Sequence, residues 1–154
     1  DPNRGFAQHL AVLETGRISL AAMAVGVAQA CLTESLRYAQ GRQQFNQPIY
    51  NFQSVQFKLA DMAVAIELAR NQYLKAAWLV DQKRNYSFEA SVAKLYASEV
   101  AMWASVEAVQ IHGGNGFVKD YHVERMMRDA KITQIYEGPS EIQKIVISRS
   151  ILKA

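Results

Sequence analysis

Proline is scarce in this chain, and its positions limit the fold more than any other feature. The three prolines are Pro2, Pro48 and Pro139, and long stretches without helix-breaking sequences lie between them. Proline lacks a backbone N–H, and its ring clashes with the preceding helical turn, so it ends or kinks helices. Long stretches without it favour long helices. The sequence therefore predicts a mainly helical protein.

Apolar residues recur at helical spacing in five segments. The clearest pattern lies within residues 52–83, where the apolar positions follow in steps of four and three: Val55, Leu59, Met62, Ile66, Ala69, Tyr73, Ala76 and Val80. Such a seam is typical of a helix in an antiparallel bundle. Residues 5–40, 88–112, 122–133 and 139–152 complete a predicted all-α fold, an up-and-down bundle of three long and two shorter helices. No segment alternates with period two over a sustained run, so we predict no sheet.

Residue size and spacing also predict which side chains form the core. Residues 18–30 are crowded with alanine and glycine, and small residues let helices pack closely, so we expect the first helix to be the most buried. Both tryptophans, Trp78 and Trp103, stand at helical positions and are predicted to lie in the core. In the third helix the seam expected to face the core is Phe88, Val92, Leu95, Trp103, Val106 and Gln110.

Length and composition exclude several classes of protein. A chain of 154 residues predicts one domain with a substantial core. The 17 basic residues exceed the 14 acidic ones by only three, and no basic block accompanies them, so we expect no nucleic-acid partner. The single cysteine, Cys31, excludes an internal disulfide and fits a reducing compartment. Its apolar surroundings predict a buried side chain.

Neither a membrane span nor a metal site is expected. The apolar run at residues 18–31 is shorter than a membrane span and is interrupted by Ser19, Gly26 and Gln29. The three histidines have no spacing typical of metal ligands: His9, His112 and His122. The polar N-terminus lacks the pattern of a signal peptide. Because the chain starts without an initiating methionine, we expect a piece of a longer protein.

Residues 134–143 contain the most distinctive local arrangement in the chain. Glu137 stands between an aromatic residue and a Gly-Pro break. Gly138 is a predicted helix N-cap, Pro139 a predicted first helical residue, and Glu141 occupies the position of a capping-box acid. Glu137 is thus expected on a sharp corner between two helices, beside apolar neighbours. It is either a general base or a carboxylate stabilised by the dipole of the adjacent helix N-terminus.

Two other features each allow two interpretations. Arg17 interrupts an apolar helix, so it either pairs with Glu14 on the helix surface or meets a bound ligand. The glycine-rich cluster at residues 113–116 does not follow a strand and therefore lacks the dinucleotide-binding fingerprint. It is either a helix C-cap with a turn or a loop whose backbone N–H groups contact a phosphate.

Several short motifs occur in a distinctive order along nearly the whole chain. They are Arg42-Gln43-Gln44-Phe45, Gln53, Leu59-Ala60-Asp61-Met62, Gln110 to Phe117, Arg128 to Ile132, and Ile135 to Gly138. In this order they resemble the C-terminal helical domain of the acyl-CoA dehydrogenase family, of the short/medium straight-chain type. The resemblance covers residues 1–154. It implies that the family's N-terminal helical domain and middle β-domain are absent here, so we expect these residues alone to be inactive.

The resemblance implies an FAD-dependent oxidoreductase of fatty acid β-oxidation. Glu137 matches the base that removes the α-proton of an acyl-CoA thioester while the β-hydride passes to flavin N5, giving a trans-2-enoyl-CoA. Tyr136 and Gly138 flank that base and match substrate-binding positions. One branch of the family carries its base at the position of Gly16, immediately before Arg17. A glycine there favours Glu137 as the base.

The resemblance also implies how substrate and cofactor are bound. Glu14 and Arg17 match an acid and an arginine that contact the substrate, although the acid is often Asp. The positions that match FAD contacts are Arg42, Phe45, Phe52, Gln53, Gln110, Ile111, His112, Gly113 and Gly114. In the family these contacts reach the FAD of a neighbouring subunit, which implies a homo-oligomer that is a dimer of dimers. Pro139 departs from the pattern, because a threonine is usual there and proline supplies no donor.

The implied redox partner is an electron-transferring flavoprotein, and the implied compartment is a bacterial cytoplasm or a mitochondrial matrix. Two alternatives remain. An acyl-CoA oxidase or another flavoenzyme of the superfamily would share the fold but differ in the reaction. The isolated chain would alternatively be a non-catalytic, oligomerising helical module.

Overall fold

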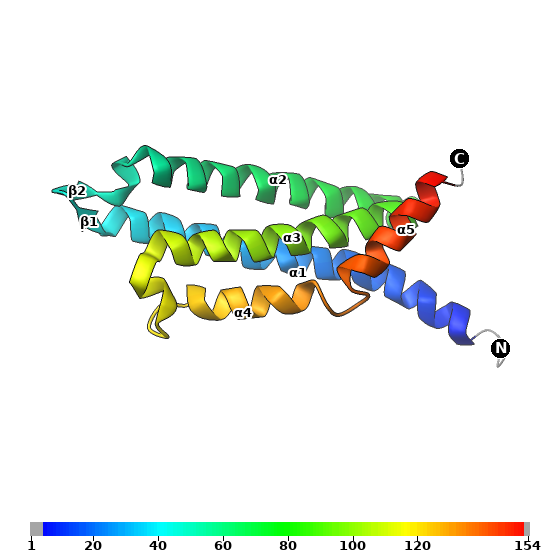
Figure 1. Cartoon of the computed structure of the whole chain (residues 1–154). Helices are drawn as coiled ribbons and strands as arrows, with labels where there is room; N and C mark the ends of the chain where they lie inside the picture. The colour runs from blue at the N-terminus through cyan, green and yellow to red at the C-terminus, as the bar shows by residue number, and fades with distance from the viewer. Residues whose placement is uncertain (1–4, 153–154) are drawn as a thin grey trace.

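The computed structural model describes residues 5–152, and the predicted all-α bundle is confirmed (Figure 1). Its elements in chain order are α1 (Gly5–Gly41), β1 (Gln43–Gln44), β2 (Gln47–Pro48), the 3₁₀ turn η1 (Ile49–Asn51), α2 (Gln53–Asp81), α3 (Ser87–His112), the 3₁₀ turn η2 (Gly113–Phe117), α4 (Val123–Thr133) and α5 (Ser140–Leu152).

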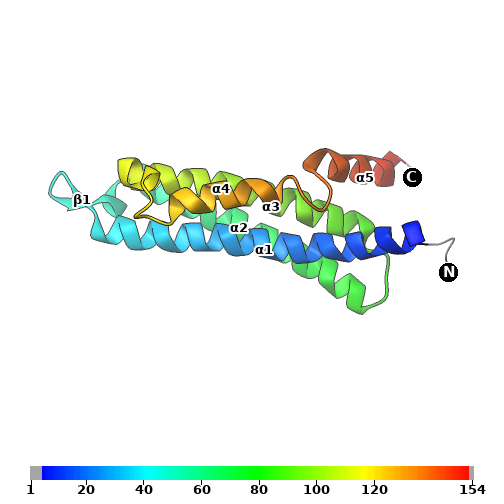
Figure 2. The same cartoon turned by 90° about the horizontal axis from the view of Figure 1, so that it is seen from below.

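The three long helices run side by side in alternating directions, as short connections between them require. Figure 2 shows α4 and α5 following one another along α3, which both helices contact. The short strands lie at the opposite end of the bundle. The bundle thus has a hairpin end and an end at which α1 begins and α5 lies.

The prediction of no sheet is wrong, because β1 and β2 form a two-stranded antiparallel sheet. Gln43 pairs with Pro48 and Gln44 with Gln47. The two residues between the strands, Phe45 and Asn46, have φ angles of 53° and 62°. Two consecutive positive φ angles give the turn that matches the twist of a hairpin. Strands of two residues are too short to produce a period-two pattern in the sequence.

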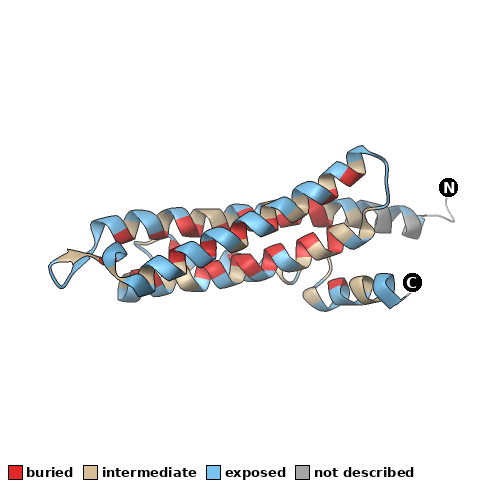
Figure 3. Ribbon diagram, turned by 90° about the horizontal axis from the view of Figure 1, so that it is seen from above, coloured by how far each residue is buried: buried red, intermediate tan, exposed pale blue. Residues whose placement is uncertain are grey.

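The buried core lies mainly between α3 and its neighbours (Figure 3). Helix α3 contacts α1, α2, α4 and α5, and half of its 26 residues are buried, so α3 rather than α1 is the most buried helix. Its buried face consists mainly of alanine and serine, and the α1 residues Ala21, Ala24 and Ala28 are fully buried as well. Small side chains on facing helices allow their axes to approach closely.

Four of the six residues of the seam predicted for α3 lie on its outer face, while Val92 and Leu95 are half-buried, so the predicted seam is corrected in part. Phe88, Trp103 and Val106 are all at least 36% exposed, and Gln110 is exposed. The prediction that both tryptophans lie in the core is also wrong, since Trp78 is 52% exposed and Trp103 is 38% exposed. Between closely packed axes there is room for alanine but not for rings, so the rings point outward.

The seam predicted for α2 is confirmed. Leu59, Met62, Ile66, Ala69 and Ala76 are buried. The remaining three seam residues are partly buried and pack against the core: Val55, Tyr73 and Val80.

Within α1, the helical segment Val12–Gly41 is long enough and apolar enough to cross a membrane. Half of the most apolar window is buried inside the bundle. This packing accounts for the apolar composition, as expected of a core helix of a globular domain.

Candidate functional site

Glu137 lies on the predicted corner, between the end of α4 and the start of α5. Glu137 and Gly138 have φ angles of 55° and 85°, so two consecutive residues adopt the left-handed conformation. The first helical hydrogen bond of α5 runs from the Gln143 N–H to the Pro139 carbonyl, at 3.2 Å. Pro139 therefore caps the helix, one residue later than the cap predicted at Gly138.

The Glu137 carboxylate lies directly over Gly16 of α1. A methyl group built on Gly16 would lie 3.0 Å from Glu137 Oε2 and 3.6 Å from Cδ. Any larger residue at position 16 would therefore displace the carboxylate. The two positions at which the resemblance places a base, residues 137 and 16, meet at one place although they are distant in the chain.

Arg17 and Glu14 lie on α1 close to this corner but do not pair with each other. Arg17 is only 8% exposed, and its Nη1 donates to Ser91 Oγ of α3 at 3.2 Å. Glu14 Oε1 accepts a hydrogen bond from Ser87 Oγ at 2.7 Å. The surface pair is thus replaced by two bonds to serines of α3. Arg17 Nε is buried and has no hydrogen-bond partner among the described residues.

Lys94 of α3 and Gln143 of α5 both donate hydrogen bonds to the backbone of the corner. Lys94 Nζ donates to the Gly138 carbonyl at 2.8 Å, and Gln143 Nε2 donates to the same oxygen at 2.8 Å. Burial lowers the pKa of Lys94, and repulsion from Arg17 lowers it further, while Glu141 and Glu137 act in the opposite direction. Sequence analysis did not identify either residue as part of the site.

Tyr136 packs against α1 beside the carboxylate. Its hydroxyl lies 3.8 Å from Met23 Sδ. Partial burial raises the pKa of Tyr136, and the neighbouring charge of Glu137 raises it further. Glu137 itself is exposed, and so are its neighbours Ile135 and Pro139. The described residues therefore form the floor of a site at Glu137 but not a closed pocket around it.

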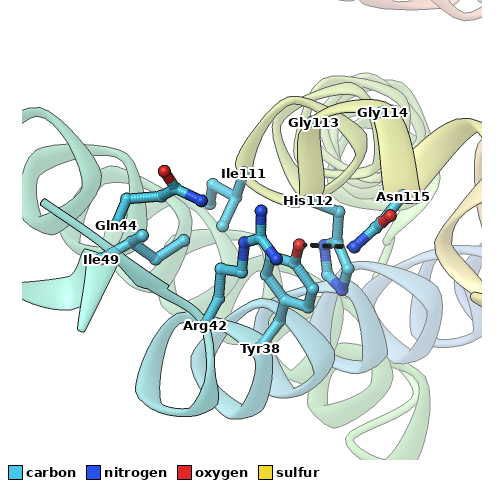
Figure 4. Close-up of a pocket in the computed structure, with 9 residues that line it drawn as sticks. All are labelled: Tyr38, Arg42, Gln44, Ile49, Ile111, His112, Gly113, Gly114 and Asn115. Atoms are coloured by element: carbon cyan, nitrogen blue, oxygen red, sulfur yellow. Dashed lines mark hydrogen bonds between the residues drawn. The ribbon is translucent and has the colours of Figure 1, made fainter. Parts of the chain in front are cut away.

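A second cluster of predicted site residues lies near the hairpin end, around a pocket of about 390 Å³ (Figure 4). Of the predicted residues, the pocket brings together Arg42, Ile111, His112, Gly113 and Gly114. It also contains four residues that were not among the predicted cofactor contacts: Tyr38, Gln44, Ile49 and Asn115. The helical spacing of four between Tyr38 and Arg42 was the available signal, because it places both on one face of α1.

Aromatic stacking and one hydrogen bond order this second pocket. The Tyr38 ring stacks on His112 at a centroid distance of 4.2 Å, and Asn115 Nδ2 donates to the Tyr38 hydroxyl at 2.9 Å. Burial lowers the pKa of His112, although the Ala108 carbonyl beside its Nδ1 acts in the opposite direction. Gly113 ends α3 with φ of 60° and ψ of −138°, which favours glycine.

The other predicted cofactor contacts lie outside this pocket. Phe45, at the tip of the hairpin, is 86% exposed and meets the edge of Phe52 at a centroid distance of 6.1 Å. Gln53 and Gln110 are also exposed. An exposed aromatic ring and two exposed amides offer stacking and hydrogen-bonding groups to another molecule rather than to this bundle.

The two clusters lie near opposite ends of α1 (Figure 2). About 25 residues separate Arg17 from Arg42, which at about 1.5 Å per helical residue places them about 38 Å apart. Within residues 5–152, no group of three or more His, Cys, Asp or Glu side chains is arranged to hold a metal ion.

Comparison with known proteins identifies the class that this fold and these sites define. Residues 3–152 match the family described as "Acyl-CoA dehydrogenase, C-terminal domain". The chain belongs to the acyl-CoA dehydrogenase family, and it corresponds to that domain.

Two curated relatives and one solved structure illustrate the match. The chain is 60% identical to the probable acyl-CoA dehydrogenase YngJ of Bacillus subtilis over 99% of its own length and 40% of that protein. It is 46% identical to the caffeyl-CoA reductase-Etf complex subunit CarC of Acetobacterium woodii over 98% of its length and 40% of that subunit. The structure of butyryl-CoA dehydrogenase from Megasphaera elsdenii matches with a TM-score of 0.96 and 47% identity, covering 97% of this chain and 39% of that one. The chain thus spans about two fifths of the proteins that it resembles.

Proposed function

We propose that this chain is the C-terminal domain of an FAD-dependent acyl-CoA dehydrogenase in which Glu137 is the catalytic base. The observation that carries this proposal is the Glu137 carboxylate, set on a left-handed corner directly over Gly16. A carboxylate that only capped a helix would need neither this conformation nor a glycine facing it. The similarity to butyryl-CoA dehydrogenase supports a short straight-chain acyl-CoA as substrate.

The reaction proposed for the complete protein removes two hydrogens from adjacent carbons. Glu137 takes the α-proton of the thioester, the β-hydrogen leaves as a hydride, and a trans-2-enoyl-CoA results. FAD supplies the hydride acceptor when it is bound. The thioester oxygen gains negative charge as the α-proton leaves, so it needs hydrogen-bond donors that are already in position. Tyr136 and Gly138 flank Glu137, and the left-handed corner fixes the direction of the backbone at that point.

Glu14 and Arg17 are proposed to position the substrate. Arg17 is buried, and its Nε–H has no partner among the described residues, which favours a polar ligand. Glu14 is held by Ser87 at 2.7 Å, so its carboxylate has a fixed direction. Both residues lie on the same stretch of α1 as Gly16.

The second cluster fits the chemistry of FAD. Arg42 offers a cation to the pyrophosphate, Gly113 and Gly114 leave the backbone accessible, and the exposed ring of Phe45 can stack on adenine. We propose that Phe52, Gln53, Gln110, Ile111 and His112 complete this cofactor contact. Because the cluster lies about 38 Å from Arg17, it serves a different FAD molecule from the one beside Glu137. The proposal therefore includes a homo-oligomer, a dimer of dimers, in which each copy contacts a neighbour's cofactor.

Ser140 is the candidate to replace the donor that proline cannot supply at position 139. Its Oγ is buried and has no hydrogen-bond partner among the described residues. It lines a polar cavity of about 320 Å³ together with Glu99, Lys131 and Lys144.

Anaerobic addition of butyryl-CoA to the complete protein tests the reaction. We expect the flavin absorbance to bleach within one turnover, and electron-transferring flavoprotein to restore it as the proposed redox partner. Absence of bleaching with straight-chain acyl-CoAs from about four to sixteen carbons would overturn the substrate assignment.

Substitution in the second cluster tests its role in cofactor binding. Arg42→Gln and Phe45→Ala should lower the FAD content of the purified complete protein, since they remove a charge and a stacking ring. Arg149→Gln, which removes an exposed cation of α5, is the matched control and should retain FAD. Full FAD occupancy and unchanged affinity in both cluster variants would contradict the assignment.

Three alternatives predict other outcomes. An oxidase of the same superfamily would consume oxygen and produce peroxide on addition of acyl-CoA. The similarity to a caffeyl-CoA reductase subunit favours a second alternative, an enoyl-CoA reductase. In that reaction Glu137 would deliver a proton to the α-carbon instead of removing one. A non-catalytic helical module would form oligomers that contain no flavin.

A further inference from the structure

A fully buried lysine lies beneath the corner that carries Glu137. The Lys94 side chain is 0% exposed, which is rare for lysine because burying a charge is unfavourable unless it is paired. Its Nζ donates to the Gly138 carbonyl at 2.8 Å. Such a residue on α3 would be expected in the core only if the fold or the site required its charge.

Gln143 converges on the same carbonyl from the other side. Its Nε2 donates to Gly138 O at 2.8 Å and lies 3.4 Å from Glu137 O. A methyl group built on Gly138 would lie 2.8 Å from this Nε2, so the amide packs directly on the glycine. Gln143 is the only residue of α5 in the described part of the chain that is buried. The buried side of α5 therefore contacts the corner through the Gln143 side chain.

The corner needs such support because its backbone is strained. A left-handed non-glycine residue is unfavourable and persists only where its surroundings enforce it, and here the left-handed Glu137 precedes a left-handed glycine. The next peptide bond ends at Pro139, which has no N–H. The Gly138 carbonyl is therefore the polar group of that peptide by which the protein can hold the turn.

Charged groups from three elements face Lys94. Arg17 of α1 repels its ammonium group, whereas Glu137 on the corner and Glu141 of α5 attract it. One turn earlier on α3, Ser91 holds the Arg17 side chain at 3.2 Å. Ser91 and Lys94 are three residues apart and lie on one face of α3. One turn of α3 therefore contacts both Arg17 of α1 and the Gly138 carbonyl of the corner.

We propose that Lys94 and Gln143 are positioning residues that clamp the Gly138 carbonyl and thereby hold the Glu137 carboxylate over Gly16 in its reactive direction. This inference rests on the proposed role of Glu137 as the base. Neither residue contacts the reacting atoms. Both act through the backbone of the corner.

The test compares single and double variants in the complete protein. Lys94→Met removes the donor at similar volume, and Gln143→Met removes the other donor. Each should lower the rate of flavin bleaching by butyryl-CoA about 10- to 100-fold, the range expected when a catalytic group is misplaced by up to about 1 Å. The affinity for butyryl-CoA and the FAD content should stay within about twofold of the unsubstituted protein. Because both donors act on one oxygen, the double variant should lose less than the product of the two single losses.

Ser98→Ala is the matched control, since Ser98 is buried on the same helix and its hydroxyl, among the described residues, bonds only to the Leu95 carbonyl. It should bleach at the unsubstituted rate. Bleaching at that rate in both Lys94→Met and Gln143→Met, or losses that multiply in the double variant, would overturn the clamp.

Hydrogen exchange provides a readout that does not depend on activity. Amides of residues 134–143 should exchange about tenfold faster in Lys94→Met and in Gln143→Met than in Ser98→Ala, because a hydrogen bond to a charged donor stabilises the corner. The same measurement on Gln143→Met tests the clamp if Lys94→Met fails to fold. If the unsubstituted protein shows no bleaching but exchange accelerates as expected, the base assignment fails while the clamp stands. Unchanged exchange in both variants would refute the clamp itself.

Discussion

Replacement of Gly16 by alanine should separate stability from activity. Glycine within a helix destabilises a protein by about 0.5–1 kcal/mol relative to alanine. Among the described residues, the added methyl group meets only the end of the Glu137 side chain, 3.0 Å from Oε2. Because this end is flexible, it can move by a few tenths of an ångström at little energetic cost. We therefore expect Gly16→Ala to be as stable as the unsubstituted protein or slightly more stable.

The same small movement should lower the rate of proton removal. If a displacement of about 1 Å costs about 100-fold, then a few tenths of an ångström cost about 4- to 10-fold. Stopped-flow flavin bleaching with butyryl-CoA in the complete protein measures this rate, and a thermal scan measures stability. Binding of butyryl-CoA should change little, because the methyl group contacts the base rather than a bound acyl chain.

Gly26→Ala is the matched control on the same helix. Apart from the adjacent residues and the local backbone of α1, no atom of the described residues lies within 4 Å of a methyl group built there. This variant should show the same small gain in stability with an unchanged bleaching rate. Equal bleaching rates in Gly16→Ala and Gly26→Ala would refute the reasoning that the carboxylate over Gly16 is the reactive group.

Two further predictions concern buried groups of the bundle. Burial lowers the pKa of His112, so the unfolded chain binds a proton at this residue more tightly than the folded protein does. The free energy of unfolding of the complete protein should therefore fall as the pH drops below about 6.5, and it should level off below the lowered pKa. Urea titrations between pH 7 and pH 5 check this, and a midpoint that stays constant or rises would contradict it. Burial also raises the pKa of Cys31 to about 12, so iodoacetamide at pH 8 should label it only after unfolding, as mass spectrometry would show. Rapid labelling of the folded protein would show that the thiol is not buried.

The spacing of large apolar residues made the fold class predictable, but the core predicted from it was wrong in part. In α2 the residues at steps of four and three do face inward, because that helix packs through side chains such as Met62 and Ile66. In α3 the contact is made by alanines, and the rings that suggested a seam lie outside it. Sequence periodicity locates a face of large residues, but it does not decide whether that face meets this bundle or another surface.

The candidate site was predictable where its residue type is unusual for its position. Glu137 beside a Gly-Pro break and Arg17 within an apolar helix both stand out in the sequence. Lys94 does not, since a lysine in a helix normally predicts a solvent-exposed position. Its role depends on contacts from α5 and on the fold of the corner. The meeting of Gly16 with Glu137 likewise depends on packing between distant segments.

Replacement of Glu137 by glutamine in the complete protein tests the central claim most directly. Glu124→Gln, which neutralises a carboxylate of α4 that pairs with Arg128, is the control. We predict that Glu137→Gln retains FAD but loses about 10²- to 10⁴-fold in the rate of bleaching by butyryl-CoA, the contribution typical of general-base catalysis. Glu124→Gln should bleach at the unsubstituted rate. Bleaching of Glu137→Gln at a rate close to that of Glu124→Gln would show that the base lies elsewhere.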